Sequence, residues 1–177
     1  MKVLVNAGHT LSGKGTGAVG YINESEHTRL VANELIKQLK EAGVNAYGCS
    51  VDKSTNYLKE VVDKANASKC DLLISIHFNA GKGKGSEVYT WKGEQNNNVC
   101  TELQKLGFKN RGIKDGSHLY IIRKTTMKAI LVEVCFLDTK TDVDLYKKVG
   151  VKKIAEAIKK GVVYEGHKKN WCCIRRN

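Results

Sequence analysis

Three short apolar runs in this chain each lead into a histidine or a glutamate. Val3–Val5 precedes His9, Leu72–Ile76 precedes His77, and Ala129–Val132 precedes Glu133. Runs of this length that are rich in β-branched residues are typical of buried strands. In an open α/β sheet, ligands bind beyond the carboxyl ends of the parallel strands, so these side chains are expected at one edge. Histidine and glutamate there predict the site of a metal-dependent hydrolase.

Helical and strand patterns alternate along the chain. Strands are expected at residues 2–7, 44–49, 72–77, 86–91, 119–122 and 129–134, the one at 86–91 being half exposed. Helices are expected at residues 25–42, from Ser54 or Thr55 onward, near 95–107 and at about 150–163, because apolar residues recur there at helical spacing. This order predicts an α/β domain in which helices and a sheet form layers.

The length of 177 residues is enough for one domain with its own core. Residues 1–164 are expected to form that domain, and residues 165–177 a tail, either a stub of a missing module or a read-through end. No apolar run approaches the roughly 20 residues of a membrane span. The first residues lack the apolar stretch of a secretory signal. We therefore expect synthesis in the cytoplasm and, for any action outside the cell, release by another agent.

The chain carries a formal net charge of +12, from 30 lysines and arginines against 18 aspartates and glutamates. Such an excess attracts polyanions, among them nucleic acid, anionic lipid and anionic cell-wall polymers. The basic residues are spread along the chain without a block of five or more, which weakens a nucleic-acid interpretation. A solvated lysine-rich surface with no partner is the alternative.

The six cysteines include no Cys-x-x-Cys pair, so a cysteine zinc site is not expected. Four of them, Cys49, Cys70, Cys100 and Cys135, lie in or beside apolar runs, where a free cysteine behaves as a small apolar residue. Without a secretory signal, we expect reduced thiols.

A zinc hydrolase usually has three protein ligands and one position for water. His9 and His77 supply two, and the third is expected to be a carboxylate, because no other histidine follows a strand. The glycine-rich stretch after His9 lets the backbone return so that a glutamate in the first turn of the next helix reaches it. Glu24, at the junction of loop and helix, is favoured over Glu26, which lies roughly 200° further round the helix. A carboxylate that only stabilises the helix start is the alternative for either residue.

Glu133 lies in the middle of an apolar run, where a charge is costly unless it is paired or functional. A structural salt bridge is one interpretation. Partial burial would also raise its pKa, which suits a general base or acid. The remaining histidines, His27, His118 and His167, are expected at the surface.

Taken in order, several short motifs resemble those of the zinc-dependent N-acetylmuramoyl-L-alanine amidases, particularly the catalytic domains of clostridial phage endolysins. The resemblance covers about residues 2–163. The motifs are Ala7-Gly8-His9, Asn23-Glu24, Ser75-Ile76-His77-Phe78-Asn79-Ala80, Gly85-Ser86-Glu87-Val88-Tyr89, Asn110-Arg111-Gly112, and Leu131-Val132-Glu133 followed by Phe136-Leu137. The chain departs from the family pattern at Cys135, Lys128 and Val61, where the family often has Gly, Pro and Arg.

The resemblance implies a fold, a site and an activity. The fold would be a twisted, mixed but mostly parallel sheet of about six strands with helices on both faces. His9, Glu24 and His77 would bind one zinc ion, and Glu133 would be catalytic. The enzyme would cleave the amide between N-acetylmuramic acid and L-alanine in bacterial peptidoglycan, as the catalytic domain of an endolysin or autolysin. Anionic wall polymers would be further partners, whereas nucleic acid and a membrane span are not expected.

Two other functions are considered on the same residues. A zinc exopeptidase or acylase would share the ligand types, and would use a fixed arginine such as Arg123 for a substrate carboxylate. A basic module without catalysis would bind wall or nucleic acid through charge alone.

Overall fold

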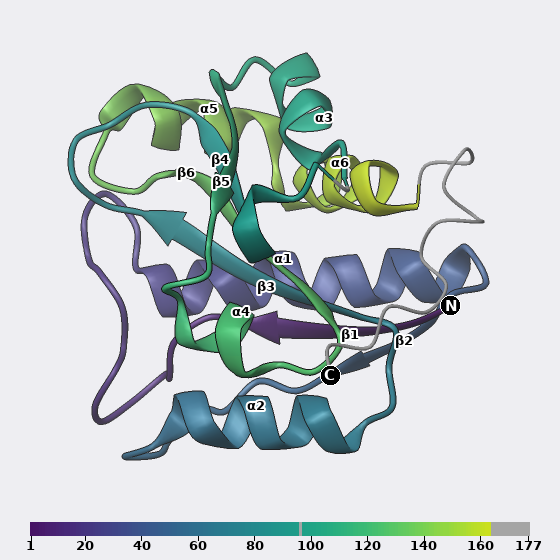
Figure 1. Ribbon diagram of the computed structural model, residues 1–177. Helices are drawn as coiled ribbons and strands as arrows, with labels where there is room; N and C mark the ends of the chain where they lie inside the picture. Colours follow the sequence, from purple (N-terminus) through teal and green to yellow (C-terminus); the bar gives the residue numbers. More distant parts are fainter. Residues whose placement is uncertain (96, 164–177) are drawn as a thin grey trace.

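The computed structural model describes residues 1–95 and 97–163, and these form a six-stranded sheet with helices on both faces (Figure 1). The order of strands in the sheet is β2-β1-β3-β6-β4-β5. The strands are β1 (Lys2–Ala7), β2 (Asn45–Gly48), β3 (Leu72–Asn79), β4 (Ser86–Thr90), β5 (Asn110–Asp115) and β6 (Lys128–Phe136). The α/β prediction with a mixed, mostly parallel sheet is confirmed.

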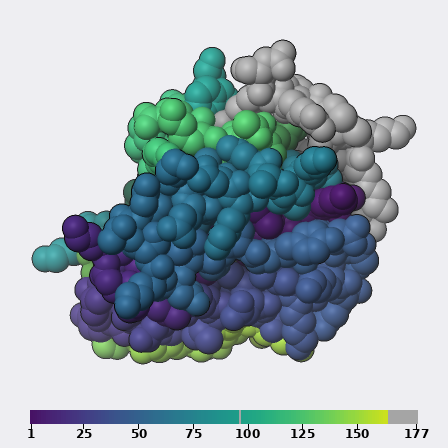
Figure 2. All heavy atoms as spheres, turned by 90° about the horizontal axis from the view of Figure 1, so that it is seen from below, coloured from purple at the N-terminus to yellow at the C-terminus, as the bar shows by residue number. Residues whose placement is uncertain are grey.

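The helices divide between the two faces of the sheet. Those with bounds in the described residues are α1 (Glu24–Glu41), α2 (Tyr57–Ala67), α3 (Val99–Lys105), α4 (Tyr120–Lys124), α5 (Lys140–Val149), α6 (Val151–Val162) and the short 3-10 helix η1 (Trp91–Gly93). Helices α1, α3, α5 and α6 share one apolar core with the sheet, and α2 and α4 share the other. Figure 2, seen from below Figure 1, shows the face that α2 covers. No helix in these residues combines the length and apolar character that a bilayer crossing needs.

The register of the sheet decides which polar residues become neighbours. Strands β2, β1, β3 and β6 are parallel, whereas β4 runs antiparallel to β6. The carboxyl ends of β1, β3 and β6 therefore meet at one edge, as the apolar runs predicted. Across this edge His77 is paired with Glu133, and Glu133 is paired with Glu87. Paired residues on adjacent strands project to the same face, so the three side chains form a row.

Part of the secondary-structure prediction is wrong. Residues 120–124 form helix α4 in place of the strand expected at 119–122, and the fifth strand is β5, a polar edge strand. Both Ile121 and Ile122 are buried, and so short an apolar run has no period that separates helix from strand. Strand β4 is mostly buried, whereas the sequence predicted that it would be half exposed. Helix α3 packs against it, and strands β5 and β6 lie on either side of it. Helix α5 was not expected at all.

The described cysteines are buried and free, in line with reduced thiols. These are Cys49, Cys70, Cys100 and Cys135. Cys172 and Cys173, and the tail expected at residues 165–177, lie outside the described residues.

Candidate metal centre

His9 begins the loop after β1 in an unusual backbone conformation. Its φ of 67° lies in the left-handed region, which non-glycine residues seldom adopt. Its carbonyl oxygen accepts a hydrogen bond from Arg29 Nη2 at 3.1 Å, and Thr28 Oγ1 donates to the carbonyl of Gly8 at 3.0 Å. Both donors belong to α1, so the helix holds the Gly8–His9 turn in place.

Glu24 is the first residue of α1 and is buried. The side chain of Asn23 caps the helix by accepting from the backbone N–H of Ser25 at 3.1 Å. Glu24 Oε2 accepts from the backbone N–H of Ala18 at 3.0 Å, which ties the glycine-rich loop to the helix. Gly17, with φ of 79°, is needed here, because a Cβ would lie 2.7 Å from Glu24 Oε2.

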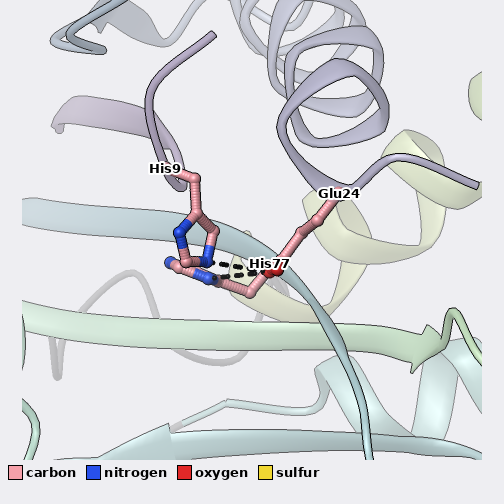
Figure 3. Close-up of side chains that lie close together, drawn as sticks. All are labelled: His9, Glu24 and His77. Atoms are coloured by element: carbon pink, nitrogen blue, oxygen red, sulfur yellow. Dashed lines mark hydrogen bonds and ion pairs between the residues drawn. The ribbon is translucent and has the colours of Figure 1, made fainter. Parts of the chain in front are cut away.

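His77 lies toward the end of β3 and points at the same carboxylate (Figure 3). Its Nδ1 is 3.2 Å from Glu24 Oε1, and His9 Nε2 is 3.1 Å from that oxygen. Gly8 makes room for the imidazole, because a Cβ at Gly8 would lie 2.3 Å from His77 Cε1. The three side chains thus come from a loop, a helix start and a strand, and meet at the edge of the sheet.

The chemistry of this cluster suits a cation. His9, Glu24 and His77 each offer one atom that could bind a metal ion, and these three atoms lie within 4.8 Å of one another. Among residues 1–95 and 97–163, this is the group of histidine, cysteine, aspartate or glutamate side chains that is close enough to hold an ion. Both ring nitrogens of His9 face acceptor oxygens, since Nδ1 is 3.1 Å from the carbonyl oxygen of Gly15. A neutral imidazole can donate from one nitrogen only. With Nδ1 donating to Gly15, a positive ion between Nε2 and Glu24 would satisfy the second nitrogen.

The electrostatics of the cluster keep the carboxylate charged and the imidazole of His77 neutral. Burial acts to raise the pKa of Glu24, but hydrogen bonds with His77 and His9 outweigh it and hold that pKa far below its ordinary value. Burial lowers the pKa of His77, against the opposing effect of Glu24. A charged carboxylate and a neutral imidazole are the protonation states in which these groups bind zinc.

Glu133 lies beside the cluster on β6 as the register partner of His77. Its Oε2 atom is buried and has no hydrogen-bond partner among the described residues. Burial, and then the negative charges of Glu24 and Glu87, raise the pKa of Glu133 to about 8. The structural salt bridge considered for Glu133 is not found among the described residues.

Glu87 and Arg111 form a polar network next to Glu133 that was not assigned a function from the sequence. Glu87 is buried and accepts from Asn79 Nδ2 at 2.7 Å, from the Tyr89 hydroxyl at 3.0 Å and from Arg111 Nε at 2.6 Å. The guanidinium carbon of Arg111 also lies 5.0 Å from the centre of the Phe136 ring. Glu87 and Arg111 each belong to one of the sequence motifs. Their contact joins two different strands, so no short stretch of sequence could have predicted it.

The other candidate residues lie apart from the cluster. Glu26, the weaker ligand candidate, is exposed on α1, and Arg123 is exposed on α4. His118 is exposed, as expected. The expectation for His27 is wrong: its ring is partly buried and its Nδ1 is 3.0 Å from the Tyr146 hydroxyl, because α5 packs there against α1 and β3. His167 lies outside the described residues.

Comparisons with known proteins give a consistent picture. The family model for N-acetylmuramoyl-L-alanine amidase matches residues 3–164. An uncharacterised 38.4 kDa protein of Clostridium perfringens is 36% identical over 92% of this chain and 51% of its own length. The endolysin of Bacillus phage SPP1 is 32% identical over 82% of this chain and 58% of its own length. The solved catalytic domain of the CD27L endolysin targeting Clostridia Difficile superposes with a TM-score of 0.85 at 34% identity, covering 92% of this chain and 97% of that one.

Fold and site together define an α/β protein with a His–Glu–His cluster at the carboxyl edge of its sheet. The chain belongs to the N-acetylmuramoyl-L-alanine amidase family. It spans about half the length of its Clostridium perfringens relatives, at 51% and 54%.

Proposed function

We propose that the chain is a zinc-dependent peptidoglycan hydrolase that cleaves the amide between N-acetylmuramic acid and L-alanine. The observation that carries this proposal is the meeting of His9, Glu24 and His77 beside an unpartnered Glu133, in a chain of the amidase family. The substrate would be bacterial peptidoglycan, with anionic wall polymers as further partners, and the place of action would be the cell wall. The endolysin of phage SPP1 and the amidase LytC of Bacillus subtilis support this assignment by similarity.

His9, Glu24 and His77 would hold one zinc ion. Two histidines and a carboxylate are a known ligand set for a catalytic zinc site, which leaves a position open for water or substrate. When bound, zinc would polarise the substrate carbonyl and make a water acidic enough to attack at neutral pH. The hydrogen bond between His9 Nδ1 and the Gly15 carbonyl fixes which ring nitrogen faces the ion.

Glu133 would move the proton. Its buried Oε2 has no partner, so it is free to accept a proton from the attacking water and to pass it to the leaving amine. With a pKa of about 8, the carboxyl holds a proton readily at neutral pH. A cation at the neighbouring cluster would lower this pKa and bring it closer to the range where both steps are efficient.

The proposal is tested on purified cell walls with the zinc-loaded protein. We expect new free amino groups at L-alanine without new reducing sugar ends, because an amide and not a glycosidic bond is cut. Removal of zinc by a chelator should abolish the release, and added zinc should restore it. Release of reducing ends, or of no fragment at all by the zinc-loaded protein, would contradict the proposal.

Two variants separate metal binding from proton transfer. The His77→Ala variant should lose zinc by elemental analysis, and activity with it. The Glu133→Gln variant should keep its zinc and its fold but lose turnover by about 10²- to 10⁴-fold, the scale of general acid–base catalysis. Normal zinc content in the first variant, or normal turnover in the second, would remove the corresponding role.

A further inference from the structure

Arg111 is held firmly but has most of its hydrogen-bonding capacity free. On β5, its Nε donates to Glu87 Oε2 at 2.6 Å, and its guanidinium lies over the Phe136 ring at 5.0 Å. Among residues 1–95 and 97–163, its Nη1 and Nη2 groups have no hydrogen-bond partner. The side chain is 32% exposed, so solvent reaches part of it.

The position of Arg111 places these free groups beside the candidate site. Glu87, which anchors Arg111, is the register partner of Glu133, so the two carboxylates lie on adjacent strands. Phe136, which lies under the guanidinium, follows Glu133 by three residues at the active edge of the sheet. Adjacent strands are about 5 Å apart. Glu87 alone therefore separates Arg111 from Glu133 along this row of side chains, and a group bound to Arg111 would lie next to a bond being cleaved at Glu133.

The ion pair with Glu87 uses only one of the hydrogen-bond donors of Arg111. Glu87 already accepts hydrogen bonds from Asn79 and Tyr89. Arginine–carboxylate pairs are frequently bidentate, with two parallel N–H groups, but here Oε1 of Glu87 is already taken by Asn79 and Tyr89. Arg111 uses Nε alone, so among the described residues both Nη groups remain available to bind a second planar anion.

We propose that Arg111 is a substrate-binding residue that recognises a carboxylate of the stem peptide, on the leaving-group side of the scissile amide. This inference rests on the proposed amidase function. Where the peptide residue after L-alanine is a glutamate linked through its side chain, its α-carboxylate lies a few bonds from the cleaved amide. The carboxylate at the end of the stem is the other source of the same chemistry, but it lies further from the cleaved amide, so we expect Arg111 to bind the α-carboxylate of the second residue.

The test compares three soluble muropeptides that differ only in charge. One has free carboxylates, one has the second-residue α-carboxylate converted to an amide, and one has the terminal carboxylate converted to an amide. For the zinc-loaded wild-type protein, we expect amidation at the second residue to raise KM by about ten- to a hundredfold with little change in kcat, the scale of a hydrogen bond to a charged group. Terminal amidation should leave KM unchanged.

The variants test whether Arg111 is the cause. Arg111→Gln should raise KM for the free-carboxylate substrate and abolish the preference over the second-residue amide. Arg111→Lys keeps a charge next to Glu87 without the planar fork, and should retain part of the preference. Zinc content and circular dichroism confirm that each variant is folded and loaded, and the wild-type substrate comparison needs no variant at all.

The outcomes distinguish this inference from the proposed function. If the wild type cleaves all three muropeptides with equal KM, Arg111 does not read a carboxylate, although the amidase function stands. The inference is also overturned if KM depends on the terminal carboxylate and not on that of the second residue. The same holds if Arg111→Gln loses activity equally on all three substrates. If the zinc-loaded wild type cleaves none of them, the proposed function fails and the inference with it.

Discussion

Glu133 is the candidate site residue whose buried carboxyl oxygen has no hydrogen-bond partner among the described residues. Its Oε2 atom is buried without a partner, and the carboxylates of Glu24 and Glu87 lie nearby. Burial first, and then these two charges, raise its pKa from 4.5 to about 8. The folded chain without metal therefore binds a proton at pH values where the unfolded chain has lost it.

The shift sets the sign of a stability change with pH. Below pH 4.5, Glu133 is protonated in both states, and its contribution is constant. As the pH rises from 4.5 to about 8, only the unfolded state releases the proton, so the free energy of unfolding falls; it levels off above that range. In the metal-free protein, Glu133→Gln should therefore be more stable than the wild type at pH 9, by roughly 2 kcal/mol after allowance for partial exposure.

Urea unfolding of both metal-free proteins at pH 4 and pH 9 measures this difference. The two proteins share every other titratable group. The change with pH in the difference between their free energies of unfolding therefore reports on Glu133. The difference should be smallest at pH 4, where both states hold the proton, and should grow in favour of Glu133→Gln at pH 9. A difference that is the same at both pH values would show that Glu133 is not held in its neutral form.

At the residue scale, the sequence was informative where a side chain follows directly from an element. The convergence of His9, Glu24 and His77 could be anticipated, because strand ends and a helix start meet at one edge of an α/β sheet. Their role as zinc ligands stays a prediction. The contact of Glu87 with Arg111 could not be anticipated, because it depends on which strands become neighbours in the sheet.

At the scale of elements, helix α1 does more than supply Glu24. Arg29, on the same helix, donates to the carbonyl oxygens of Ser25, His9 and Val51, and to the carboxylate of Asp52. It therefore joins α1, the loop after β1 and the segment after β2. His9, with its left-handed backbone, lies at the centre of this arrangement. Such a conformation costs about 1–3 kcal/mol and persists only where the surroundings enforce it.

We expect Arg29→Ala to weaken zinc binding by about ten- to a hundredfold, the range found when groups that orient metal ligands are removed. The reason is that the carbonyl of His9 loses its donor, so the imidazole is no longer fixed relative to Glu24. The dissociation constant is measured by competition with a chromophoric chelator, which is independent of activity.

Asp52→Asn is the matched control for Arg29. The Asp52 side chain is 68% exposed, so its ion pair with Arg29 is screened by water, and its loss leaves the hydrogen bond to His9 in place. Zinc affinity should change little in this variant. If Asp52→Asn and Arg29→Ala weakened zinc binding equally, the ion pair and not the carbonyl contact would hold the loop.

The elements that sequence patterns predicted well are the ones with a strong period or a long apolar run. Strands β1, β3 and β6 and helices α1 and α6 are of this kind. Strand β5, with the sequence NRGIKD, is an edge strand with partly exposed residues and no alternation, so only pairing with β4 makes it a strand. Helix α4 is a single turn whose apolar residues pack under the sheet, a tertiary effect that overrides local propensity.

At the scale of the whole molecule, the net charge is +12. Not all of the lysines that contribute to it lie where positive charge stabilises a helix. Lys147 and Lys148 end α5, where positive charge is favourable, but Lys152 and Lys153 begin α6, where the helix dipole opposes it. All four are exposed and lie on either side of Gly150. Within the described residues, none of the four belongs to an ion pair closer than 4.0 Å. This concentration of unpaired charge suits an extended anionic partner.

We expect this charge to recruit the protein to anionic wall polymers, so binding to whole cell walls should weaken steeply as salt is raised. The Debye length is about 8 Å at 0.15 M salt and shortens further above that, which screens an exposed lysine surface but not the buried candidate site. Cleavage of a short soluble muropeptide should therefore hardly change over the same salt range. The measurement is a pull-down with purified walls, in parallel with muropeptide turnover.

Replacing Lys147, Lys148, Lys152 and Lys153 by Gln should reduce wall binding at low salt without affecting turnover of the soluble substrate. Wall binding that is independent of salt would instead indicate a specific ligand contact and make the lysine excess a feature of solubility.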